Sequence, residues 1–112
     1  MVAKLAIHPA FYQRVRHYRD RIEKREGRPQ VARRFVKAAQ DAIPVLLENP
    51  HRGHSAGFEA DDLADILRLT VPGFATFAVF YRWDEELLTV ITLEHTAQDL
   101  PSRLATLLPK LS

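Results

Sequence analysis

The chain has 112 residues, the length of one domain, and a hydrophobic fraction of 46%, which is typical of a globular protein and argues against disorder. It has no cysteine, so disulfides and thiolate metal sites are excluded, and no apolar run approaches the roughly 20 residues of a membrane span. Residues 1–50 hold 11 Lys and Arg against 5 Asp and Glu, whereas residues 51–112 hold 5 against 9. We expect one soluble, cytoplasmic domain over residues 1–112, with a basic face that attracts an anionic partner. A solvated helix face is the alternative.

Residues 2–8 alternate in the manner of a short strand, which Pro9 ends because proline has no N–H for a ladder. From Ala10 the apolar spacing changes to every three or four residues, which predicts a helix that stops at Gly27. Its apolar stripe consists of Phe11, Val15, Tyr18 and Ile22.

A second helix is predicted from Pro29 to about residue 48, where "ENP" ends it. Its stripe consists of Val31, Phe35, Ala38, Ala42 and Leu46. Pro44 is expected to kink this helix or to restart it as a new short turn. Because the link at Gly27 is short, the two helices should pack as an antiparallel hairpin.

The last part of the chain is β in character. Residues 51–65 lack a sustained period and contain two of the four glycines, so we expect a surface loop. Residues 65–71, 74–83 and 87–95 predict three strands joined as an antiparallel meander.

These elements predict a two-layer α+β fold in the order β-α-α-β-β-β. The helical hairpin should cover one face of a small, mainly antiparallel, twisted sheet. The other face should stay partly open, and function is expected there.

Three stretches in this order carry a family resemblance: "LLENPHRG" after the second helix, "LRLTVPGFATFAVFYR", and the closing "LEHTAQDL". From Val2 to about Leu104 the chain resembles the RelE/ParE superfamily of toxins from bacterial type II toxin–antitoxin pairs. The ParE-like branch is similar to inhibitors of DNA gyrase that need no nuclease chemistry. The RelE-like branch resembles ribosome-dependent endoribonucleases that cut mRNA.

The closing block, with His95 followed by Gln98, Asp99 and Leu100, is similar to the ParE-like ending. A resemblance to the RelE-like branch would imply many Lys and Arg on the open face of the sheet and a Tyr near the C-terminus. This chain has no Tyr after Tyr81. Residues 65–112 contain only four cations, which are Arg68, Arg82, Arg103 and Lys110. The resemblance therefore implies a gyrase poison, with a RelE-like mRNA endonuclease as the first alternative and a non-toxic binding module on the same fold as the second.

If the chain cleaves RNA without a metal, Arg68 and Arg82 are the candidates to bind phosphate and His95 to carry the proton. Tyr81 or Glu94 is the candidate for a second group. Alternation, however, puts Tyr81 and Arg82 on opposite faces, and Arg68 has the alternative of pairing with Glu94 or a nearby aspartate.

The polar groups after the last strand have two interpretations. His95 and Asp99 either fix the strand-to-tail corner through side-chain to backbone hydrogen bonds or form a functional edge. His51 and His54 lie near Asp61 and Asp62 in sequence, but nothing orders them as a tetrahedral set, so no metal and no cofactor is expected.

The resemblance also implies an antitoxin whose disordered, often acidic segment folds on binding. We expect it to occupy an apolar groove between the hairpin and the sheet edge. Candidate walls are Phe11, Tyr12, Phe35 and the tail residues 104–111, including Leu107 and Leu108; the alternative is that they pack internally. Arg14, Arg68, Arg82 and other basic helix residues (Arg16, Arg19, Arg21, Arg33, Arg34) are candidate contacts to gyrase or nucleic acid.

Overall fold

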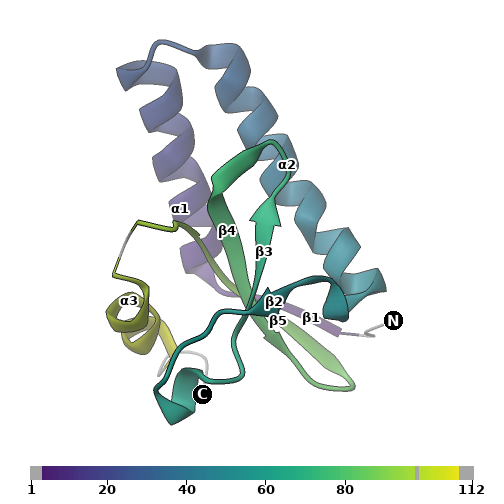
Figure 1. Cartoon of the computed structure of the whole chain (residues 1–112). Helices are drawn as coiled ribbons and strands as arrows, with labels where there is room; N and C mark the ends of the chain where they lie inside the picture. The colour runs from purple at the N-terminus through teal and green to yellow at the C-terminus, as the bar shows by residue number, and fades with distance from the viewer. Residues whose placement is uncertain (1–3, 98, 109–112) are drawn as a thin grey trace.

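Two long helices lie on one side of a five-stranded sheet in the computed structural model, which describes residues 4–97 and 99–108 (Figure 1). The strands are β1 (Lys4–Ile7), β2 (His54–Ser55), β3 (Leu67–Val71), β4 (Phe74–Trp83) and β5 (Leu87–His95). The helices are α1 (Pro9–Asp20), extended by a π-helical segment (Arg21–Arg25), α2 (Pro29–Glu48) and α3 (Leu100–Leu107).

The strand order in the sheet is β1-β5-β4-β3-β2. β1 is parallel to β5, with Lys4 opposite Leu87, and every other pair is antiparallel. This arrangement confirms the predicted α+β fold and the meander of β3, β4 and β5. The strand β2, which has two residues inside the expected loop, and the helix α3 at the C-terminal end are absent from the predicted β-α-α-β-β-β order.

Local chemistry explains the ends of the hairpin. His8 caps α1 by accepting the Ala10 N–H at its Nδ1 (3.0 Å), and Pro9 occupies the first turn, where an N–H has no helical partner. Gly27 has φ +66° and lets the Arg28 N–H reach back to the Ile22 carbonyl (3.1 Å), so the predicted stop is confirmed. α2 runs through Pro44 to Glu48 without interruption, so the predicted restart at this proline is wrong.

The main core lies between the hairpin and the sheet. The predicted stripe of α1 is buried there, together with Phe35 and Leu46 of α2. Val79 and Tyr81 of β4 point into this core, whereas Ala78 and Phe80 belong to a second core. Alternation along β4 thus separates Tyr81 from Arg82, as the sequence predicted.

The expectation of a partly open reverse face is wrong over much of the sheet. A second core covers that face, formed by Leu63, Ile66, Ala78, Phe80, Ile91, Leu100, Leu104 and Leu108. Its cover comes from α3 and from the segment between β2 and β3, which crosses in front of the sheet in Figure 1. Leu100 and Leu104 of α3 and Leu108 directly after it recur every four residues, so they form an apolar stripe that needs a surface to bury it.

Candidate interaction surfaces

A carboxylate with no exposed surface, that of Glu94, lies at the junction of α1, β5 and α3. Its Oε1 accepts hydrogen bonds from Arg14 Nε (3.1 Å) and the Tyr18 hydroxyl (3.2 Å). Its Oε2 accepts from the Thr92 hydroxyl (2.7 Å) and Arg103 Nε (2.6 Å). Two cations and two hydroxyls satisfy the buried charge, so this cluster is a structural junction. Arg14, which the sequence predicted to contact a partner, makes its described hydrogen bonds within this cluster.

His95 follows directly and fixes the corner after β5. Its N–H donates to the Tyr18 hydroxyl (3.1 Å), its Nδ1 accepts the Ala97 N–H (3.0 Å), and its ring meets that of Phe77 edge-on. This geometry confirms the structural interpretation for His95. Asp99 is different: it precedes α3, but its side chain makes no capping hydrogen bond. Gln98 lies outside the described residues.

Arg82 and Arg68 lie on the reverse side of the sheet. Arg82 donates to both carboxylate oxygens of Asp65 (2.6 and 3.0 Å) and to the Asp62 carbonyl (3.0 Å). Arg68 is exposed, opposite His54 of β2 and Phe80 of β4. The predicted pairing of Arg68 with Glu94 is wrong, because Arg14 and Arg103 occupy that carboxylate.

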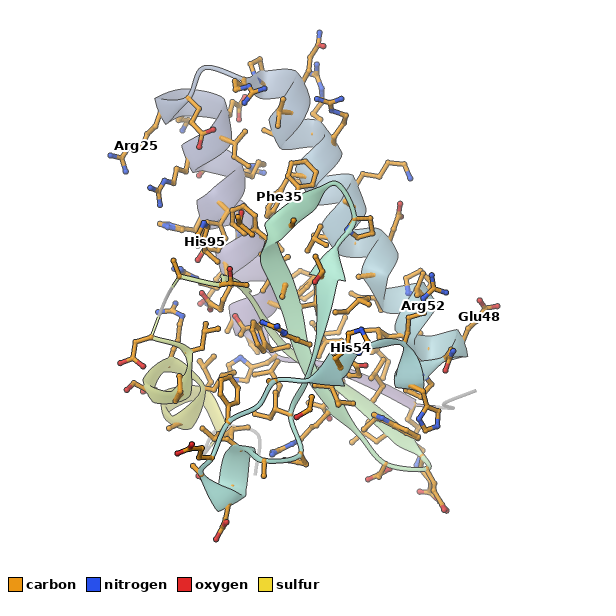
Figure 2. The ribbon with its side chains drawn as sticks, viewed as in Figure 1. Arg25, Phe35, Glu48, Arg52, His54 and His95 are labelled. Carbon is orange, nitrogen blue, oxygen red and sulfur yellow. The ribbon has the colours of Figure 1, made fainter. Side chains whose placement is uncertain are left out.

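The groups considered for RNA cleavage therefore do not converge. His95 pairs with Phe77, whose side chain packs against the main core, so it lies on the hairpin side of the sheet. Arg68 and Arg82 lie on the other side, and Figure 2 shows His54, the strand partner of Arg68, well apart from His95. Tyr81 is buried in the main core.

The "NPHRG" turn is built around the Tyr81 hydroxyl. This hydroxyl donates to the Pro50 carbonyl (2.7 Å) and accepts the Gly53 N–H (3.0 Å). Burial raises the pKa of Tyr81, and the hydrogen bond from Gly53 opposes that rise. A side chain at position 53 would collide with the Tyr81 hydroxyl, which explains the glycine. This part of the motif is structural.

A hollow of about 860 Å³ lies between the turn end of the helical hairpin and the β3–β4 turn. Ile22, Phe74 and Phe77 form part of its apolar wall. Arg21, Arg28 and Arg34 also line it, with Glu26 and His95. The hollow combines apolar surface with an excess of positive charge.

A second hollow, about 520 Å³, lies between α1 and α2 and contains Tyr12, Val36 and Gln40. Tyr12 is 48% exposed, the most exposed large hydrophobic side chain in the described part of the chain. Phe11 and Phe35, in contrast, are 1% and 0% exposed and follow the internal-packing alternative.

The described part of the C-terminal tail also packs largely inside. Leu108 is buried in the second core, and Leu107 is half-buried beside a hollow of about 370 Å³ that Ile7 and Gln13 share. Residues 109–111 of the predicted tail lie outside the described residues.

In the described ranges, no three His, Asp or Glu residues are grouped so that they could hold a metal ion. The same ranges contain no helix that is both long and apolar enough to cross a membrane.

The profile of one protein family, the ParE toxin of the type II toxin–antitoxin system parDE, matches residues 5–100. The chain belongs to the ParE toxin family. Its fold is similar to a solved structure described as the chromosomal ParDE TA system from P. aeruginosa, with a TM-score of 0.66 at 14% identity. That similarity covers 84% of this chain and 96% of the other. A comparison with curated proteins finds no match.

Membership of the ParE toxin family confirms the resemblance to RelE/ParE toxins and identifies the chain as a toxin of a type II system. Sequence reasoning missed the Glu94 junction of this ParE-family toxin. The signal for it was a Glu inside an otherwise apolar strand, "LLTVITLEH", which requires cations from elsewhere in the fold.

Proposed function

We propose that this ParE-family toxin stops growth by inhibiting DNA gyrase in the cytoplasm and has no cleavage chemistry of its own. The observation that carries the proposal is the family match over residues 5–100. The separation of Arg68 and Arg82 from His95 supports it, because metal-independent RNA cleavage needs its proton carrier and phosphate-binding groups around one phosphate.

The decisive experiment adds the purified toxin to a gyrase supercoiling assay and, in parallel, to a translating extract with a defined mRNA. We expect supercoiling to fall with toxin concentration while the mRNA stays intact. A toxin unfolded by heat serves as the control for non-specific effects. Cut mRNA with normal supercoiling would establish the RelE-like alternative. No effect in either assay, at saturating toxin, would leave a non-toxic binding module.

The second part of the proposal is neutralisation by a cognate antitoxin. The hollow around Tyr12 supports it, because an exposed aromatic side chain between two helices suits a helix or an extended segment of a partner. Arg16 and Arg19 line the same hollow and favour an acidic segment. Leu107 offers a further half-buried apolar contact.

Co-expression with a candidate antitoxin tests this part. We expect growth to recover and the two proteins to purify as one complex. Addition of the antitoxin to the supercoiling assay should then restore gyrase activity. Recovery of growth without a stable complex would contradict direct neutralisation.

A further inference from the structure

The turn end of the α1–α2 hairpin is strongly basic. Between residues 21 and 34 there are six Lys and Arg and only two Glu. We call these six cations the basic tip: Arg21, Lys24, Arg25, Arg28, Arg33 and Arg34. All six are exposed. Figure 2 shows Arg25 at this end of the hairpin, pointing away from the body of the protein.

The cations of the basic tip have no ion-pair partners among the residues that the structure describes. Elsewhere on the same hairpin three of the four Lys and Arg are in ion pairs: Arg14 with Glu94, Arg19 with Asp20, and Lys37 with Asp41, whereas no ion pair is described for Arg16. The fold thus pairs most of the cations along the body of the hairpin and forms no ion pair with the six at its end.

His17 lies one turn before the basic tip, and one of the six tip cations, Arg21, acts on it electrostatically. Burial lowers the pKa of His17, and the charges of Arg14, Arg21 and Arg103 lower it further, against the opposing effect of Glu94. The local potential is therefore positive.

Among the residues that the structure describes, the basic tip itself presents no exposed large hydrophobic side chain, although three of its cations line the large hollow, whose apolar wall includes Ile22, Phe74 and Phe77. In the described part of the chain the exposed large hydrophobic residues are Leu5 and Tyr12, which lie on β1 and in the first turn of α1. Protein–protein interfaces centre on buried aromatic or aliphatic side chains, whereas protein–DNA interfaces are polar and strongly positive. The composition of the basic tip fits the second class.

We propose that the basic tip binds the phosphate backbone of double-stranded DNA without regard to sequence. The spacing is compatible with this, because two packed helices lie about 8–10 Å apart, and over that width each strand of duplex DNA presents about two to three phosphates. The inference rests on the proposed function, because gyrase holds duplex DNA. The basic tip would give the toxin a second contact in a gyrase–DNA complex.

The test measures binding of the purified toxin to a labelled 20-base-pair duplex by fluorescence anisotropy between roughly 50 and 200 mM salt, the range in which counterion release is resolved. The tip variant is K24A/R25A/R33A, whose three side chains lie outside the large hollow. The control is K4A/K37A/R52A, which removes the same charge from exposed positions elsewhere. Circular dichroism verifies that both variants fold.

We expect the tip variant to bind roughly tenfold more weakly and to reduce the slope of log K against log salt by about 2.7, the value for three lost phosphate contacts. The control should retain the parent slope. Equal slopes for the two variants would overturn the inference. Tighter tip-dependent binding of a poly-glutamate peptide, or of an RNA duplex, would also overturn it in favour of that partner.

This measurement contains no gyrase, so its result is separable from the proposed function. If the toxin binds DNA through the basic tip but leaves gyrase active, the proposed gyrase inhibition is contradicted and the proposed DNA binding is supported. If the toxin inhibits gyrase and both variants bind DNA equally, only the proposed DNA binding by the basic tip is overturned.

Discussion

Arg103 in α3 donates a 2.6 Å hydrogen bond from Nε to Oε2 of Glu94 in β5, whose side chain is fully buried. On the other carboxylate oxygen the donors come from α1. One side chain therefore joins the last helix to the first through the sheet. Because a buried charge that loses its partners is costly, we expect this junction to be sensitive to the loss of a single partner.

The variant Glu94→Gln should lower the free energy of unfolding by about 1.5–3 kcal/mol, because the partly exposed Arg14 and Arg103 lose charge-assisted hydrogen bonds to the carboxylate. Urea unfolding followed by circular dichroism measures the change. Asp41→Asn is the matched control, since it breaks an exposed pair with Lys37 and should cost less than about 1 kcal/mol. A Glu94→Gln effect as small as that of the control would contradict the structural role of the junction.

Tyr81→Phe should destabilise the protein by about 1–3 kcal/mol at neutral pH, because the Pro50 carbonyl and the Gly53 N–H lose their partner. Burial raises the pKa of Tyr81 in the folded state. The stabilisation is therefore complete below the unfolded pKa of about 10 and is lost as the pH rises through the folded pKa. The difference between parent and variant should shrink above about pH 10. A difference that grows in this range would contradict the assignment.

Gly53→Ala should destabilise by roughly 1–3 kcal/mol, although the backbone at this position is extended. The cost is steric: the added Cβ would collide with the Tyr81 hydroxyl and lie 2.7 Å from the Arg68 carbonyl oxygen. Thermal unfolding measures the effect, and His54→Ala, at the exposed neighbouring position, is the control. If both variants melt at the parent temperature, the contact is not tight.

Tyr12→Ala should weaken antitoxin binding by about 10- to 100-fold, because exposed aromatic side chains are the commonest dominant contacts in interfaces. Isothermal titration calorimetry with the purified antitoxin gives the affinity. Since Tyr12 is half exposed, the melting temperature should change little. Lys4→Ala, an exposed change on β1, is the control. Unchanged affinity would move the antitoxin site away from the α1–α2 hollow.

The elements of this fold that depend on local pattern could be predicted. The α1 stripe, Phe11, Val15, Tyr18 and Ile22, is buried throughout, because a spacing of three and four residues determines which side of a helix faces the core. Gly27 ends the hairpin for an equally local reason, its positive φ.

The contacts that join distant segments could not be predicted in this way. Glu94 receives donors from Arg14 and Tyr18, which are separated from it by 80 and 76 positions. The sequence shows a carboxylate in an apolar strand but not which cations reach it. The sequence predicted the C-terminal leucines to bind a partner, whereas they pack on the chain's own sheet. An apolar stripe does not reveal which of these two surfaces it covers.

The pairing of β1 with β5 has a consequence for folding during synthesis of the chain. Lys4 is synthesised long before its neighbour in the ladder, Leu87. Until most of the chain has been synthesised, β1 has no ladder to join, and α1 has no finished platform beneath it. Such distant pairings form late and slowly. The β1–β5 ladder and the packing of α1 on β5 can therefore be completed only after residues 87–90 have been synthesised.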